Sequence, residues 1–240
     1  HMTAKPKRYL AAVLFIIAAA TLFLASAATA DVLLYDGKPY LHVIHEGRSI
    51  KIQRIQDPGY ELKGYFAKTA RKCPPFCIQP IAVDPAVRTV GEIELFHFME
   101  NDLREGRGVL IDARTPSWHR KGTIPGSVNY PFTLFTQDEN AGERDAILRE
   151  FGAKPRQQPG LLEKTMQELG LSDKRYLTDR WDFTEAKTLV IWCNGPACGQ
   201  SPRAIEGLIS AGYPADKIFY YRGGMQMWQL WGLTTVIPES

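Results

Sequence analysis

Beyond about residue 85, hydrophobic and polar positions alternate between helical and strand-like patterns. A capping box that runs from Thr89 to Glu92 opens the first helical segment, which we expect to end near Gly106. The apolar residues that recur there at helical spacing are Ile93, Phe96, Met99 and Leu103. The segment is therefore predicted to be an amphipathic helix.

Three short apolar runs are typical of strands that are buried on both faces of a parallel sheet. They are GVLIDAR at 108–114, TLVIWC at 188–193 and KIFYY at 217–221. Helices are predicted for ERDAILREF, for PGLLEKTMQELG between Pro159 and Gly170, for SPRAIEGLISAGY and for RGGMQMWQLWG. We expect the apolar positions of the first two helices to pack on the sheet. This alternation predicts an α/β fold with helices on both faces of a parallel sheet, and a helical insertion at about 133–187.

Residues 31–85 show a different pattern, with shorter apolar runs and frequent turns. Asp36-Gly37 and Glu46-Gly47 are turn signals between runs rich in Val, Ile, Tyr and Leu. We therefore predict a small β-rich N-terminal region ahead of an α/β domain at 86–240. His42 and His45 lie within it, but two histidines without a third ligand favour a structural role over a metal site.

The first 30 residues carry the pattern of a secretory signal. His1 precedes Met2 and is expected to be an added residue, and basic residues lead into an apolar stretch from about Leu10 to Ala28. An Ala28-Thr29-Ala30 site follows, which predicts cleavage after Ala30 and a periplasmic or otherwise exported protein. The alternative is an uncleaved membrane anchor at residues 10–28.

Composition narrows the classes of partner. The chain has 240 residues, 45% of them hydrophobic, and a net charge of +3 with its basic residues scattered. This distribution argues against a nucleic acid partner, and a membrane is expected only if the N-terminal segment is retained. We expect no metal and no cofactor.

The four cysteines form two local pairs. Cys73 and Cys77 bracket two prolines and a phenylalanine, a spacing looser than that of zinc sites, and an exported context favours a disulfide between them. A reactive pair is the alternative.

The second pair lies where a predicted strand meets a helix. Cys193 ends the strand, and Ser201 is expected to cap the following helix with Pro202 at its first position. The intervening loop would present backbone amides and the positive end of the helix dipole to the sulfur, which lowers the pKa of a thiol. The site therefore suits a thiolate nucleophile that holds an anionic adduct. Asp112 and Arg114, at the carboxyl end of another strand, are expected beside it.

Three segments resemble the signature segments of the rhodanese, or thiosulfate sulfurtransferase, domain family. They are GVLIDARTPSWHRKGTIPGSVNYPF, VIWCNGPACGQSPRAIEGLISAGY and FYYRGGMQMWQLWGL, in family order. The resemblance implies a rhodanese-like fold in which Cys193 takes a sulfane sulfur from a donor, holds it as a persulfide and passes it to a thiophilic acceptor. It also implies that Asp112 and Arg114 match the family's Asp-x-Arg element, and that Gly223-Gly224 and Trp228 match its closing turn and helix.

Two departures from the family pattern bear on the substrate. Gly199-Gln200 stand where a basic residue is usual, and Thr123 replaces the histidine of the Gly-His-Ile-Pro-Gly element. Gly199 also occupies the arginine position of the related Cys-x5-Arg phosphatases, which disfavours phosphatase activity.

The loop residues expected to bind substrate are Asn194, Gly195, Ala197, Gly199, Gln200 and Ser201. Arg203, on the first turn of the helix, could reach an anion in the loop or be a solvated surface residue. The tryptophans at 118, 192, 228 and 231 are expected to be core rather than ligand contacts.

Three functions remain open. The first is an exported sulfurtransferase that acts on a small sulfur-containing anion and a thiol acceptor. The second is a thiol-disulfide or polysulfide redox protein that cycles Cys193 and Cys198 and works with a redox protein partner. The third is a non-catalytic rhodanese-type binding module. In the first two, Cys193 is the predicted nucleophile and Cys198 a resolving or protecting thiol. The alternative for Cys198 is that it only packs under the loop.

Overall fold

A computed structural model describes residues 32–156, 161–171 and 180–239 of the chain. The predicted signal segment and Pro159 lie outside these residues. Within the described ranges, no helix is both long and apolar enough to span a membrane.

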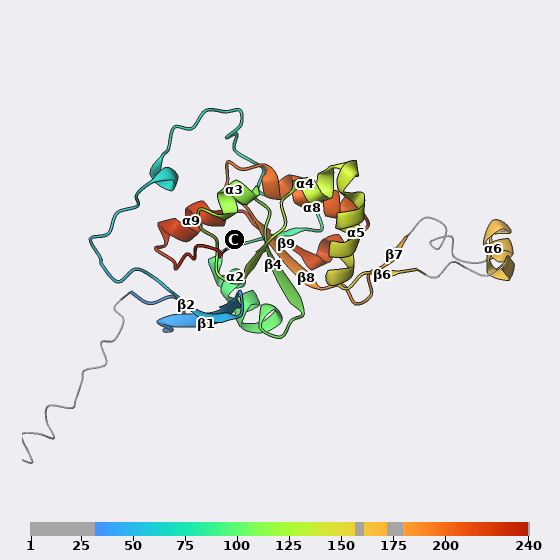
Figure 1. The fold of residues 1–240 in the computed structure, drawn as a ribbon, viewed down its shortest axis with the longest axis horizontal. Helices are drawn as coiled ribbons and strands as arrows, with labels where there is room; N and C mark the ends of the chain where they lie inside the picture. The colour runs from blue at the N-terminus through green and yellow to red at the C-terminus, as the bar shows by residue number, and fades with distance from the viewer. Residues whose placement is uncertain (1–31, 157–160, 172–179, 240) are drawn as a thin grey trace, which may run out of the picture. The chain divides into compact units, whose positions relative to one another are not determined.

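A five-stranded parallel sheet forms the centre of the fold (Figure 1). Its strand order is β3 (Arg88–Val90), β9 (Ile218–Tyr221), β8 (Thr188–Trp192), β4 (Gly108–Asp112) and β5 (Ser127–Asn129). The three predicted strands are β4, β8 and β9, and they occupy the middle of the sheet. Because Asp112 pairs with Trp192, and Trp192 with Tyr221, these three strands end at the same edge.

Two layers of secondary structure cover the sheet, as predicted for this α/β class. On one face lie α4 (Thr133–Thr136), α5 (Ala141–Glu150) and α8 (Gln200–Ser210), whose apolar side chains pack with those of the strands. On the other face lie α2 (Glu92–Phe98), its π-helical continuation η2 (Met99–Leu103) and α9 (Gly224–Leu230).

The remaining elements are short. They are η1 (Tyr65–Ala67), α3 (Pro116–His119), η3 (Asp138–Asn140), α6 (Leu161–Glu168), η4 (Ala215–Lys217), and an antiparallel pair formed by β6 (Lys154–Pro155) and β7 (Trp181–Asp182).

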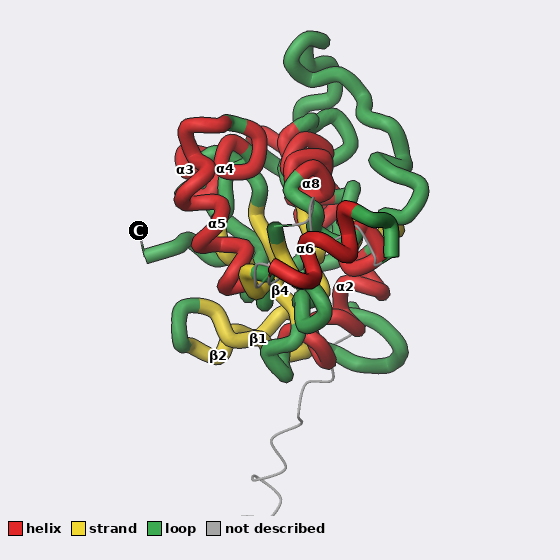
Figure 2. Tube along the Cα trace, turned by 90° about the vertical axis from the view of Figure 1, so that its right-hand side faces the viewer, coloured by secondary structure: helices red, strands yellow, loops and turns green. Residues whose placement is uncertain are grey.

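The predicted β-rich N-terminal region contains an antiparallel hairpin of β1 (Tyr40–His45) and β2 (Arg48–Gln53) (Figure 2). Glu46 and Gly47 form its turn, both with positive φ, as a two-residue hairpin requires. Leu41 and Val43 face the core that α2 and α9 share with the sheet. The hairpin therefore extends the hydrophobic core of the α/β domain.

Two predicted helix starts are wrong. Thr89 lies in β3, and α2 is capped at Gly91, whose backbone N–H donates to the Glu94 carboxylate at 3.0 Å. The helix α8 begins at Gln200 after Gly199, so Ser201 lies inside the first turn. A capping pattern identifies a helix start only to within a residue or two, because neighbouring polar residues compete for the same amides.

The packing expected of the second insertion helix is also wrong. Leu161, Leu162 and Met166 of α6 are exposed, as are Leu169 and Leu171 after it. The predicted helix forms, but its apolar side chains do not reach the sheet. By contrast, Ile147 and Leu148 of α5 are buried in the core, as expected.

Gly207 marks the closest approach of α8 to its neighbour α4. A Cβ atom at Gly207 would lie 2.4 Å from the carbonyl oxygen of Phe135, whereas one at Gly142 in α5 would meet nothing within 4 Å. We predict that Gly207→Ala lowers the free energy of unfolding by about 1–3 kcal/mol through overpacking. Gly142→Ala should raise it by up to about 1 kcal/mol. Urea unfolding of both variants checks this, and equal effects would contradict the packing described.

Candidate active site

The sulfur of Cys193 lies at the carboxyl edge of the sheet. Cys193 directly follows β8, and the loop to Gly199 leads into α8. Cys193 and Cys198 are both free thiols and both buried, with Cys193 only 2% exposed. The structure thus brings the two predicted cysteines together under one loop.

Hydrogen bonds surround the Cys193 sulfur. The Ser201 hydroxyl donates to Cys193 Sγ at 2.8 Å, and Cys193 Sγ lies 3.4 Å from the Cys198 carbonyl oxygen. The loop closes on itself through the Cys198 amide, which donates to the Gly195 carbonyl at 3.0 Å. The Ser201 side chain, predicted to cap the helix, therefore binds the sulfur instead.

These contacts determine which cysteine ionises first. Burial raises the pKa of Cys193, but hydrogen bonds from Cys198, from the Ser201 hydroxyl and from the backbone amides of Ser201 and Gly195 outweigh it and lower the pKa to about 7. The pKa of Cys198 is raised by its hydrogen bond to Cys193 and by burial. Cys193 is therefore the thiol that ionises first, whereas Cys198 stays protonated near neutral pH.

The turn between β9 and α9 clamps the first loop residues in place. The Met225 amide donates to the Cys193 carbonyl at 3.0 Å, and the Gln226 amide to the Asn194 carbonyl at 3.1 Å. Gly224 makes this approach possible, because it has a φ of 52° and a Cβ there would lie 2.1 Å from the Cys193 carbonyl oxygen.

Asp112 and Arg114 form a buried ion pair behind the loop. Arg114 donates to both Asp112 carboxylate oxygens, at 2.8 and 2.7 Å, and its guanidinium also stacks on Trp192. A third nitrogen reaches the Asn194 side-chain oxygen at 3.3 Å. Both charged side chains are almost fully buried, so they contact the loop rather than the solvent. The structure therefore places them where they orient Asn194.

Two further residues complete this network, and one was missed by the sequence analysis. His119 Nδ1 lies 2.9 Å from Asp112 Oδ2, and the Thr123 hydroxyl donates to the same oxygen at 3.0 Å. Thr123 thus contributes a donor at the position where the family has histidine. His119 follows Asp112 by seven residues, and α3, between them, turns its ring back to the strand. This turn leaves no periodic pattern in the sequence, so the sequence analysis had no signal for His119.

The other predicted loop residues lie around the sulfur at greater distance. Gln200 accepts from Cys198 Sγ at 3.9 Å, and Ala197 and Gly199 are half-buried. Arg203 is exposed, and its guanidinium rests on the Phe132 ring and donates to the Gly199 carbonyl. No group of three metal-binding side chains occurs in the part of the chain that the structure describes.

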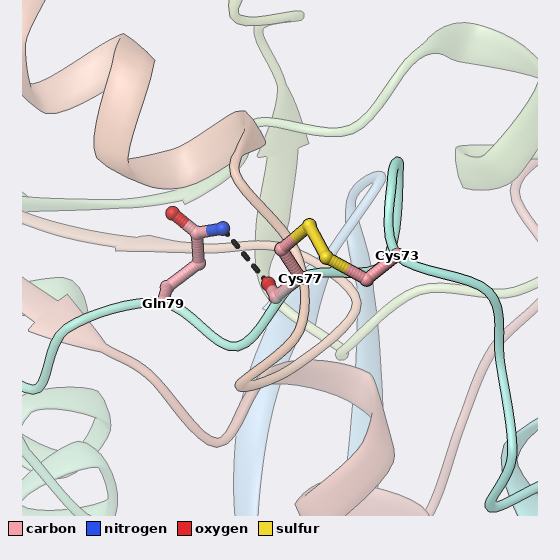
Figure 3. Close-up of a disulfide and its surroundings, with 3 residues drawn as sticks. All are labelled: Cys73, Cys77 and Gln79. Carbon is pink, nitrogen blue, oxygen red and sulfur yellow. Dashed lines mark hydrogen bonds between the residues drawn. A yellow bond between two sulfur atoms is a disulfide. The ribbon is translucent and has the colours of Figure 1, made fainter.

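Cys73 and Cys77 form the predicted disulfide (Figure 3). Gln79, two residues later, donates from its side-chain amide to the Cys77 carbonyl at 2.9 Å. Of the four tryptophans expected to be core residues, Trp192 and Trp228 are buried, whereas Trp118 is half-buried and Trp231 exposed.

The family is established by comparison with known domains. The model of the rhodanese-like domain matches residues 97–230, more than half of the 240 residues. The chain therefore belongs to the rhodanese-like domain family, in agreement with its parallel sheet and its two covering layers.

Solved structures show the same likeness at low identity. A human single-domain sulfurtransferase is 20% identical, with 60% of this chain and 96% of that chain covered and a TM-score of 0.34. A rhodanese-related protein from Thermoplasma volcanium is 16% identical, with 63% and 99% covered and a TM-score of 0.35. A thiosulfate sulfurtransferase from Pseudomonas aeruginosa is 16% identical, with 64% and 21% covered and a TM-score of 0.36. Comparison with curated proteins gave no match.

The buried ion pair predicts a large effect of a charge-conserving substitution. Arg114→Lys keeps the charge but cannot form the two-pronged contact with Asp112, so buried acceptors are left unsatisfied and we expect the free energy of unfolding to fall by about 1–3 kcal/mol. The matched control is Arg107→Lys at an exposed pair with Asp102, where we expect less than about 1 kcal/mol. Urea unfolding at pH 7 measures both.

The same pair predicts a pH dependence. Burial raises the pKa of Asp112, but the hydrogen bonds from Arg114 and His119 lower it below its ordinary value. Its contribution to stability is therefore present above the unfolded pKa of about 4 and is lost as pH falls through the folded pKa.

The substitutions at Arg114 and Arg107 test the ion pair itself. If Arg114→Lys destabilised no more than Arg107→Lys, the pair would not hold the loop as described.

Proposed function

We propose that this protein is an exported sulfurtransferase that carries sulfane sulfur as a persulfide on Cys193. The observation that carries the proposal is the buried Cys193 sulfur at the end of β8, which accepts a hydrogen bond from the Ser201 hydroxyl at 2.8 Å. The same contacts lower the pKa of this thiol to about 7. Such groups stabilise negative charge on sulfur, whether thiolate or persulfide. Membership of the rhodanese-like family supports the same reading.

The proposed reaction has two displacement steps. With thiosulfate as the donor, the Cys193 thiolate attacks the outer sulfur, a Cys193 persulfide forms, and sulfite leaves with the electrons of the broken sulfur–sulfur bond. A thiolate acceptor then attacks the outer sulfur of the persulfide and carries it away, which restores the Cys193 thiolate. Neither step needs an oxidant.

Cys198 supports a second, narrower proposal. Its raised pKa keeps it protonated while Cys193 is ionised, and its Sγ donates to the Gln200 side-chain oxygen at 3.9 Å. When peroxide oxidises Cys193 to a sulfenic acid, Cys198 can condense with it to form a disulfide and water, which blocks further oxidation. This step also describes the redox alternative. The binding-module alternative gives no reason for a nucleophilic Cys193.

The roles of the two cysteines are tested by intact mass spectrometry after incubation with thiosulfate or polysulfide. We expect the wild type to gain one sulfur that cyanide removes, Cys193→Ser to gain none and Cys198→Ser to gain it normally. Under peroxide, Cys198→Ser should form more sulfinic acid at Cys193 than the wild type. If Cys193→Ser still accepts sulfur, or Cys198→Ser alone loses it, the assignment is reversed.

Export is the part of the proposal that rests on the N-terminal sequence and on the Cys73–Cys77 disulfide, which persists in oxidising compartments. We expect the mature protein from its native host to begin at Asp31, as read by N-terminal sequencing. Retention of residues 3–29 would instead indicate a membrane anchor.

A further inference from the structure

The segment that precedes the matched family domain covers the active-site loop. The Gln79 backbone amide donates to the Pro196 carbonyl at 2.8 Å, and the Gln79 side chain lies against Gly199. Arg222, which follows β9, fixes the segment from the other side by donating to the carbonyls of Gln79 and Pro80. Residues 71–80, here called the wall, therefore contact the active-site loop through Gln79 and come from outside residues 97–230.

Arg71 lies at the end of this wall that faces the start of the loop. Its Nη2 donates to the Gln226 side-chain oxygen at 3.1 Å. Gln226 is itself in contact with the loop, because its amide binds the Asn194 carbonyl and a Cβ on Gly195 would lie 2.9 Å from the Gln226 Cβ. One side chain thus separates the Arg71 guanidinium from the residues next to Cys193.

Aromatic rings hold the guanidinium in this position. Arg71 lies 5.3 Å from the Tyr65 ring centroid and 5.1 Å from that of Phe76. The Tyr65 ring in turn packs against Trp118 of α3, with 4.7 Å between ring centroids. The Cys73–Cys77 disulfide closes the turn that carries Phe76, so it acts as a positioning element for Arg71.

The charge of Arg71 is not neutralised by these partners. An amide oxygen and two rings carry no net charge, and a half-buried guanidinium with these partners favours an incoming anion. The loop itself offers no positive charge, since residues 194–200 contain no lysine or arginine. Arg203 and Arg222 already donate to backbone carbonyls.

We propose that Arg71 binds the oxyanion end of the sulfur donor and so determines specificity for donors of the thiosulfate or thiosulfonate class. This inference rests on the proposed function of Cys193. A guanidinium can donate two parallel hydrogen bonds to two oxygens of such a group, and the donor oxygens replace the Gln226 contact.

The first test is steady-state sulfur transfer from thiosulfate to cyanide. Arg71→Gln should raise KM for thiosulfate about 10–100-fold, the range expected for loss of a charge-assisted hydrogen bond, with kcat changed less than about threefold. Arg71→Lys should recover part of the loss. The matched control is Lys68→Gln, on the same segment and beside the same Tyr65 ring, which should leave KM unchanged. An unchanged KM in Arg71→Gln would overturn the inference.

The second test does not require sulfur transfer. Alkylation of Cys193 by anionic iodoacetate and by neutral iodoacetamide is followed by intact mass in the wild type and in Arg71→Gln. We expect the ratio of the iodoacetate rate to the iodoacetamide rate to fall at least about fivefold in the variant. If the ratio of alkylation rates falls in Arg71→Gln but the wild type accepts no sulfur, Arg71 is an anion site and the proposed function is refuted. An unchanged ratio refutes the anion site alone.

Discussion

The site depends on the balance between two effects on the Cys193 sulfur. Burial removes the sulfur from water, and the protein supplies hydrogen bonds to it in place of water. Burial alone would raise the pKa of the thiol. Donors from Ser201, Cys198 and the loop amides reverse that effect and lower the pKa to about 7. Because every one of these donors comes from the loop or from the first turn of α8, the loop must hold one conformation for the sulfur to remain reactive.

Three separate parts of the fold hold that conformation. The backbone of Cys193 and Asn194 is bound to the amides of α9, an approach that only glycine at 224 permits. Beneath the loop, the buried pair of Asp112 and Arg114 reaches the Asn194 side chain. Above it, the disulfide-closed N-terminal segment binds Pro196 through Gln79. The β-rich N-terminal region is therefore part of the site as well as of the core.

The sequence predicted the central strands, the covering helices and the position of Cys193 between β8 and α8, because buried parallel strands and the strand–loop–helix junction leave strong local patterns. The strand β3 leaves no such pattern, because it depends on a partner strand, β9, that lies far along the chain. The ring of His119 leaves none either, because the short helix α3 turns it back onto Asp112 without any periodic signal. The exact first residue of α8 was missed, and with it the role of Ser201, because the same hydroxyl suits a helix cap and a sulfur contact equally well. The contact of Gln79 with the loop could not be predicted, because no sequence pattern in residues 71–80 indicates which part of the fold they contact.

The most direct measurement of the central claim is the pH dependence of Cys193 alkylation by iodoacetamide. Intact mass spectrometry monitors the reaction in the wild type and in the Cys198→Ser background. In the wild type, the account predicts a midpoint near pH 7, and a higher midpoint when Ser201→Ala removes the hydroxyl. Ser210→Ala, on the exposed side of the same helix, should leave the midpoint unchanged. A wild-type midpoint near pH 9, or one that Ser201→Ala does not move, would contradict the claim that hydrogen bonds from the loop and α8 activate this sulfur.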